Sequence, residues 1–242
     1  PAILGEMTAE NDALSQNAYL HMGLAALQLK ERNQARMAFE QASRMDFDPS
    51  IQEQALFNYA LCIHETSYSP FAESVMVFER FLNEYPSSVY AEKVNDYLVE
   101  VYMNTRSYEV ALRSIDKITH PSARILEAKQ KLLFRMGTQL FAQADYTGAL
   151  DYFTRSLQLG QYNQKTKADA YYWRGESKYR LARYPEAAND LRLYLEFATD
   201  KSSQEYGLAL YCLGYSLFKQ KQYNSARDWF VRCVQNGRAQ EP

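Results

Sequence analysis

A pattern of small and large residues recurs six times along this chain of 242 residues, and it restricts the possible folds more than any other feature. Each copy has a small residue, a second small residue twelve positions later (fourteen in the second copy), and a large apolar residue four positions further on. Successive second small residues are 39, 37, 38, 38 and 39 positions apart, at Ala35, Ser74, Ala111, Ala149, Ala187 and Ala226. A fixed period of this length is typical of stacked structural repeats.

Each part of the pattern has a physical reason. Two antiparallel helices can cross closely where small residues meet, and a large residue one turn further on is expected to fill the space toward the next pair. The first small residues are Gly23, Ala60, Val99, Gly137, Gly175 and Gly214, and the large ones are Phe39, Phe78, Ile115, Phe153, Leu191 and Phe230. Glycine and proline are scarce, and no β-branched run bounded by turn residues occurs. The sequence therefore predicts an all-α, right-handed α-solenoid of six helix-turn-helix repeats.

The pattern also places the repeats. We expect one solenoid domain over 1–242, with repeats near 12–49, 50–87, 88–123, 124–163, 164–201 and 202–237. First helices are expected near 12–29, 51–65, 88–104, 124–143, 165–181 and 203–219, and second helices near 33–45, 70–84, 108–118, 147–158, 185–198 and 223–235. Pro185 should open a second helix, where its missing N–H is harmless. The segment 64–70 should form a longer turn.

The two ends of the chain suggest a continuing array. Residues 1–10 resemble the tail of a preceding repeat, and the chain starts without an initiator Met or a signal peptide, as a mature form or an excised segment would. Asn236-Gly237 ends the sixth repeat without a polar capping helix. Solenoid ends normally need such a cap. We therefore expect either a fragment of a longer array or an end covered by a second copy.

The sequence contains no recognisable catalytic constellation. Phosphate-binding glycine loops, GxSxG and HExxH are missing, and His21, His64 and His120 lie in three different repeats. We expect no enzyme activity and no cofactor or metal. The three cysteines are far apart and are expected to be small buried thiols, with a disulfide or metal site as the alternative: Cys62, Cys212 and Cys233. A net charge of −2 without a basic patch argues against nucleic-acid binding, and no apolar run is long enough to span a membrane.

The turns within the repeats carry a family resemblance. The segments Tyr108-Glu109-Val110-Ala111, Tyr146-Thr147-Gly148-Ala149, Tyr184-Pro185-Glu186-Ala187 and Tyr223-Asn224-Ser225-Ala226 resemble the tetratricopeptide repeat (TPR). The usual TPR period is about 34 residues. The lengthened form, with the segment from Phe81 to Ser88, looks like the repeats of bacterial envelope proteins, such as the lipoprotein of the β-barrel assembly machine and the Tol-Pal coordinator. The resemblance implies protein or peptide partners and favours the periplasm or envelope over the cytoplasm.

In such solenoids the first helices line the concave face, and helical spacing selects the side chains that point into it. The candidate partner-binding residues are Asn58, Asp96, Tyr97, Glu100, Arg135, Tyr172, Trp173, Glu176, Tyr179, Arg180, Tyr211 and Tyr215. The carboxylates could receive a basic or amide-rich segment, and the tyrosines could supply flat apolar contact. The alternative is that these aromatic side chains pack against the neighbouring first helix.

Three functions remain open at this point. The first is a non-enzymatic scaffold that binds an extended peptide or a partner helix in the concave groove, with bacterial envelope assembly as the setting that the resemblance suggests. The second is a structural spacer or self-association segment of a longer array, forming homo-oligomers through uncapped ends. The third is a regulatory module of an enzyme encoded elsewhere in the full-length chain.

Overall fold

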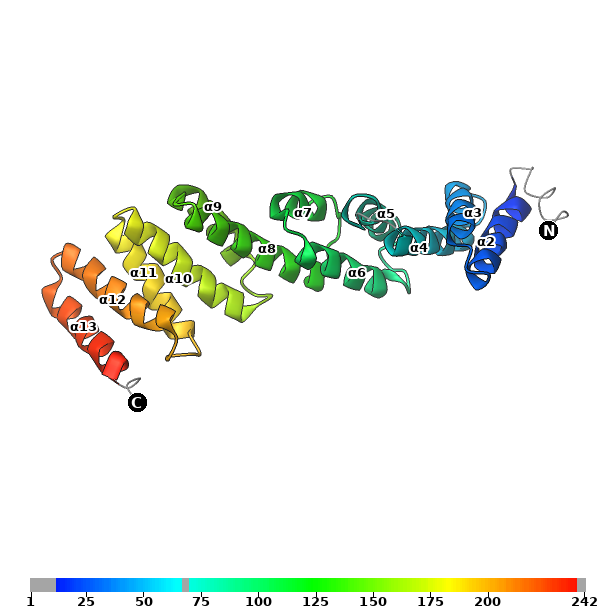
Figure 1. Cartoon of the computed structure of the whole chain (residues 1–242). Coiled ribbons are helices and arrows are strands. Elements are labelled where there is room, and N and C mark those ends of the chain that lie inside the picture. Colours follow the sequence, from blue (N-terminus) through cyan, green and yellow to red (C-terminus); the bar gives the residue numbers. More distant parts are fainter. Residues whose placement is uncertain (1–11, 67–69, 239–242) are drawn as a thin grey trace. The chain divides into compact units, whose positions relative to one another are not determined.

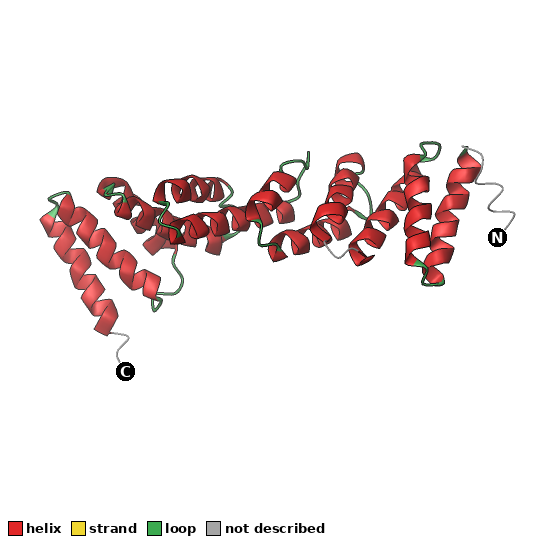
Figure 2. Ribbon diagram, turned by 45° about the horizontal axis from the view of Figure 1, so that its top comes forward, coloured by secondary structure: helices red, strands yellow, loops and turns green. Residues whose placement is uncertain are grey.

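The computed structural model describes residues 12–66 and 70–238, and within these ranges it contains helices and no strand (Figures 1 and 2). The expected fold class, an all-α solenoid of helical repeats, is confirmed. The helices are α2 (Ala13–Gln28), α3 (Arg32–Arg44), α4 (Pro49–Thr66), α5 (Pro70–Glu84), α6 (Ala91–Asn104), α7 (Tyr108–Ile115), α8 (Ala123–Ala142), α9 (Tyr146–Gln158), α10 (Gln164–Arg180), α11 (Tyr184–Phe197), α12 (Gln204–Lys219) and α13 (Tyr223–Arg238).

The helix ends lie close to the positions expected from the sequence pattern. The clearest difference is α7, which ends at Ile115 and not at residue 118. The chain after Ile115 forms tighter turns than an α-helix, because the N–H groups of Lys117 and Ile118 donate to carbonyls three residues back. Pro185 lies in the first turn of α11, as expected. The tail expected over residues 1–10 and the centre of the longer turn, residues 67–69, lie outside the described residues.

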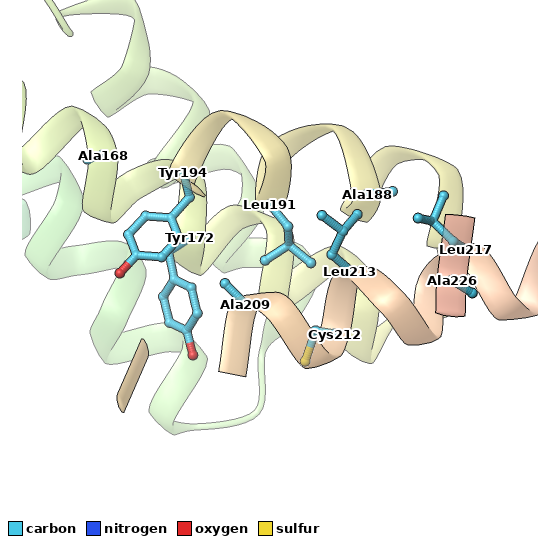
Figure 3. Packing of buried hydrophobic residues seen from close by; sticks show 10 residues of the cluster. All are labelled: Ala168, Tyr172, Ala188, Leu191, Tyr194, Ala209, Cys212, Leu213, Leu217 and Ala226. Carbon is cyan, nitrogen blue, oxygen red and sulfur yellow. The ribbon is translucent and has the colours of Figure 1, made fainter. Parts of the chain in front are cut away.

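The chain divides into two compact units, residues 1–125 and 126–242. In the first unit α2 packs on α3, α3 on α4 and α4 on α5. In the second unit α10 packs on α11, α11 on α12 and α12 on α13. Buried side chains between successive helices form the core of each unit. The core of the second unit contains Ala168, Tyr172, Ala188, Leu191, Tyr194, Ala209, Cys212, Leu213, Leu217 and Ala226 (Figure 3).

Glycine allows the first helix of a pair to approach the large residue of the second helix. A Cβ atom added to Gly23 would lie 2.5 Å from the ring of Phe39, and one added to Gly137 would lie 2.7 Å from Phe153. The pairs Gly175–Leu191 and Gly214–Phe230 repeat the contact at 3.0 and 2.9 Å. The large residue therefore packs on the glycine of its own pair, whereas the sequence pattern suggested the space toward the next pair. Because glycine has no Cβ atom, the large side chain fits between the two helices of its own pair.

Four turns between paired helices share one backbone conformation. Lys30, Ala144, Ala182 and Lys221 have φ between 57° and 62°, in the left-handed region that glycine usually occupies. Each lies five positions before the second small residue of its repeat. The next residue donates its N–H to a carbonyl five residues back, as in Arg183 to Lys178 at 2.8 Å. This hydrogen-bond pattern is the Schellman motif, which satisfies carbonyls at a helix end.

Candidate partner-binding surface

The four candidates of the first unit lie on α4 and α6 and differ in exposure. Asn58 is half-buried, and its amide donates to the carbonyl of Gln54 at 2.8 Å, one turn back in its own helix. Asp96 is exposed and forms an ion pair with Arg124. Glu100 is exposed as well. In this unit the candidate carboxylates therefore do lie at the surface.

Tyr97 of α6 is held by other rings of the first unit. Its ring stacks on Phe78 with 5.6 Å between centroids and an interplanar angle of 8°, and it lies 5.0 Å from His64. Phe78 is completely buried. Tyr97 therefore closes the edge of the core and presents its remaining surface outward.

In the second unit, two central candidates are buried. Tyr172 of α10 is 4% exposed, and its ring packs 5.1 Å from Tyr194 of α11 (Figure 3). Glu176 is 6% exposed, accepts a hydrogen bond from Arg180 at 2.9 Å and lies 3.4 Å from the sulfur of Cys212. Burial, with the nearby Glu176 carboxylate, raises the pKa of Tyr172. These two side chains serve packing between α10 and its neighbours, and Arg180 is the exposed partner of that ion pair.

Trp173 and Arg135 are half-buried. The ring of Trp173 meets Phe141 of α8 edge-on, with 4.9 Å between centroids. Its other ring neighbour is Tyr172, again edge-on at 5.2 Å. Trp173 therefore joins α8 to α10 while keeping part of its surface accessible.

Three candidates, Tyr179, Tyr211 and Tyr215, belong to a connected group of rings, which we call the aromatic row. Tyr179 lies 5.7 Å from Tyr215 and 6.0 Å from Tyr184, and Tyr215 lies 6.3 Å from Tyr211 and 6.4 Å from Phe218. Tyr211 is 46% exposed and Phe218 is 49% exposed. The row thus contains Tyr179, Tyr184, Tyr211, Tyr215 and Phe218. It runs over α10, α11 and α12, with Tyr211 and Phe218 exposed and the other three rings half-buried.

A cation already lies on the row. The ammonium of Lys219 is 5.3 Å from the centre of the Tyr215 ring, at a distance typical of a cation–π contact. Phe218 lies four positions after Gly214, where helical spacing also points into the groove, whereas Tyr184 was not predicted from the sequence as a groove residue. Tyr184 is the first residue of α11, a second helix, and the spacing rule considered first helices alone.

A buried ion network in the second unit was not predicted. Asp190 of α11 is 3% exposed and accepts two hydrogen bonds from Arg174 at 2.8 and 2.7 Å and one from Lys178 at 2.8 Å. Arg174 and Lys178 are four positions apart and therefore lie on one face of α10. The sequence signal was a basic pair on a first helix opposite an acidic residue next to Leu191.

The described residues show neither a metal cluster nor a membrane helix. Within 12–66 and 70–238, the His, Cys, Asp and Glu side chains form no group of three that could hold a metal ion. None of the described helices combines the length and apolar character needed to cross a bilayer. Cys62 and Cys212 are buried free thiols, and Cys233 is half-buried.

Comparison with known proteins identifies one repeat directly. The tetratricopeptide repeat family model matches residues 16–49, which span most of α2 and α3. Comparison with curated proteins gives no match.

Similar solved structures include MamA, with 16% identity over 70% of this chain and 90% of that chain at a TM-score of 0.40. The apo form of RapI has 15% identity over 97% of this chain and 68% of that chain at 0.47. The TPR domain of P58(IPK) has 14% identity over 93% and 61% at 0.41. Helix pairs follow one another through the described residues, and the glycine contact and the left-handed turn recur in the pairs α2–α3, α8–α9, α10–α11 and α12–α13. Residues 16–49 are therefore similar to a tetratricopeptide repeat, and the described chain continues as an α-solenoid of helix pairs.

Proposed function

We propose that this protein is a non-enzymatic scaffold that binds an extended peptide or a partner helix on the aromatic row. The observation that carries the proposal is the exposure of two rings of the row on α12, with Tyr211 at 46% and Phe218 at 49%. Aromatic side chains provide large contact areas with few rotatable bonds, and they dominate binding hot spots. Lys219 and Arg180 beside the row would restrict which charges a partner can present.

The experiment starts from peptides selected on the full chain from a random display library. Fluorescence anisotropy then measures their affinity for the double variant Tyr211→Ala/Phe218→Ala. Both side chains are largely exposed, so the fold should tolerate the change. We expect a loss of about tenfold or more, the magnitude of a hot spot. The matched control is Val110→Ala, a residue 43% exposed on α7 of the other unit. Equal affinity of the double variant and the control would remove the aromatic row from the proposal.

Bacterial envelope assembly is part of this proposal through the resemblance of the lengthened repeats. It predicts partners that reach the periplasm. Fractionation of the natural source tests it, since recovery of the full-length protein in the cytosolic fraction alone would exclude this setting.

A second candidate function is self-association through α13. In the repeat register, Phe230 and Val234 of α13 correspond to Leu191 and Leu195 of α11, which α12 covers. Among the described residues, Val231 and Val234 remain 48% and 55% exposed, and they line a groove of about 580 Å³ together with Phe218 and Tyr223. We propose that a second copy covers this face. Analytical ultracentrifugation should show dimers that Val231→Glu/Val234→Glu dissolves, and a wild-type monomer at high concentration would exclude this candidate.

A further inference from the structure

A second concave site of the second unit lies apart from the aromatic row. It is a cavity of about 630 Å³, walled by the end of α11, the following loop and the first turns of α10 and α12, with Phe134 of α8 on one side. Tyr172, Trp173 and Tyr194 contribute aromatic surface, and Figure 3 shows Tyr172 and Tyr194 with their rings close together. The cavity therefore has an apolar, π-rich floor.

The rim of this cavity is acidic. Asp169, Asp200 and Glu205 line it together with a single basic side chain, Lys165. Lys165 already forms an ion pair with Asp169, with 3.0 Å between its ammonium and that carboxylate. Asp200 accepts hydrogen bonds from the backbone N–H and the hydroxyl of Ser202, at 2.9 and 2.6 Å. Within the described residues no basic side chain forms an ion pair with Asp200 or Glu205, so the cavity keeps about two uncompensated negative charges.

The resident groups show which sign of charge the cavity favours. The hydrogen bond to Asp169 and the charge of that carboxylate raise the pKa of Lys165 against the effect of burial, and Tyr194 and Glu205 raise it further. The Asp200 hydrogen bonds hold the pKa of that carboxyl below its usual value, so it stays ionised. Beside the cavity, the ammonium of Lys167 already lies 4.6 Å from the centre of the Phe197 ring. Cations are thus stabilised here by carboxylates and by aromatic faces together.

An anion is the competing ligand, because two helices begin at this cavity and helix N-termini attract negative charge. Both N-termini are already capped. Asn163 accepts from the N–H of Thr166, and Ser203 accepts from the N–H of Tyr206. With those donors engaged and three carboxylates around the rim, the balance favours a cation.

We propose that this cavity binds the guanidinium group of an arginine side chain. A guanidinium is planar, stacks on aromatic rings and donates to carboxylates from several N–H groups at once, so it suits a π-rich floor under an acidic rim. Asp200 and Glu205 are its acceptors, and Trp173 is its stacking surface. The inference that this arginine belongs to a peptide rests on the proposed scaffold function. The inference that the cavity binds a guanidinium group does not depend on that function.

The test uses Trp173 as a reporter. The protein has two tryptophans, and Trp229→Phe leaves Trp173 as the sole indole fluorophore. The probe is N-acetylarginine amide, titrated into this full-length variant. We expect a change in Trp173 emission with a Kd on the order of 1 mM, which is typical of a small ligand with few contacts. N-acetyllysine amide should bind about fivefold more weakly, and N-acetylcitrulline amide, a neutral ligand of the same shape, should not bind.

Charge variants in the same background complete the test. Asp200→Asn/Glu205→Gln should weaken binding about tenfold, and the loop should keep its shape because the introduced asparagine amide can still accept from Ser202. The matched control Asp151→Asn/Glu186→Gln removes one exposed carboxylate of each kind elsewhere in this unit and should leave affinity unchanged. Binding of citrulline as tight as arginine, equal binding of lysine and arginine, or unchanged affinity in Asp200→Asn/Glu205→Gln would each overturn the proposal.

The outcome is separable from that of the scaffold proposal. If the arginine amide fails to bind while selected peptides still need Tyr211 and Phe218, the cavity proposal falls and the scaffold stands. If the amide binds while Tyr211→Ala/Phe218→Ala leaves peptide affinity unchanged, the cavity stands and the aromatic row falls.

Discussion

Among the described residues, the most deeply buried carboxyl groups of the two units are satisfied in opposite ways. Glu79 of the first unit and Asp190 of the second are both 3% exposed. Glu79 accepts from two hydroxyls, that of Tyr102 at 2.8 Å and that of Ser114. Asp190 accepts from a guanidinium and an ammonium. Equal burial therefore does not imply equal charge, since neutral donors permit a protonated acid and paired cations stabilise a carboxylate.

The largest expected effect comes from removing Asp190. Asp190→Ala leaves Arg174 and Lys178, which are 18% and 14% exposed, without their shared carboxylate. We expect a loss of about 3 kcal/mol in the free energy of unfolding, at the lower end for a broken buried ion pair because both cations retain some contact with water. Hydrogen exchange should show α10 and α11 losing protection while α2 to α4 keep theirs, because repeat units are stabilised mainly by their neighbours. Asp151→Ala, which breaks an exposed pair with Arg155, should change stability by less than about 0.5 kcal/mol. Equal effects of the two variants would contradict a buried network.

A helix crossing that packs glycine on phenylalanine and one that packs it on leucine should respond differently to one added methyl group. In the first unit, Gly23→Ala puts a Cβ 2.5 Å from the enclosed Phe39 ring and should cost about 2 kcal/mol through overpacking. In the second unit, Gly175→Ala meets Leu191 at 3.0 Å, and the gain in helix propensity of about 1 kcal/mol offsets that smaller strain. Urea unfolding of both variants measures the difference. A larger loss for Gly175→Ala than for Gly23→Ala would contradict the crossing geometry.

A smaller effect distinguishes the buried acids by how each makes the free energy of unfolding depend on pH. Burial raises the pKa of Glu79 above its ordinary value of 4.5, against the lowering influence of its hydroxyl partners and Lys117. Between pH 4.5 and the raised pKa of Glu79, the native state therefore binds more protons than the unfolded state. The stability that Glu79 contributes is fully present below pH 4.5 and is lost as pH rises through the raised pKa.

Glu79→Gln should remove this dependence at a cost of about 1 kcal/mol or less in acid, since Gln can still accept from Tyr102 and Ser114. The measurement is the urea midpoint of wild type and Glu79→Gln from pH 4.5 to neutrality. We expect the wild type to lose its advantage as pH rises. Parallel curves would show that Glu79 is ionised throughout, like a carboxylate paired with a cation.

The thiols provide the mildest comparison. Burial raises the pKa of Cys62 in the first unit to about 11, and it raises that of Cys212 in the second unit further. Half-buried Cys233 should react first with Ellman's reagent in the native protein, because both access and thiolate fraction govern the rate. Cys233→Ser should remove the fast phase. Persistence of that phase would show that Cys62 or Cys212 is reached by local opening.

The helix pairs were predictable because their spacing records a local steric requirement. A first helix with Gly175 and a second helix with Leu191 can cross closely in one way, and the same arrangement recurs at Gly23, Gly137 and Gly214. The candidate surface was less predictable. Helical spacing gives the direction of Glu176 on α10, but its burial depends on Cys212 of the next first helix, 36 positions away. The networks of Glu79 and Asp190 likewise depend on partners from other helices.

The left-handed residue in four turns has a consequence for how this sequence can diverge. Lys30, Ala144, Ala182 and Lys221 differ chemically, yet their backbone is the same, and main-chain hydrogen bonds close each turn. This conformation costs an L-residue roughly 1–2 kcal/mol, which glycine avoids. Each position is therefore a point where glycine should raise stability without touching any binding surface. Because main-chain hydrogen bonds hold the turn, the residue types at these four positions can change during evolution while the repeat period stays the same.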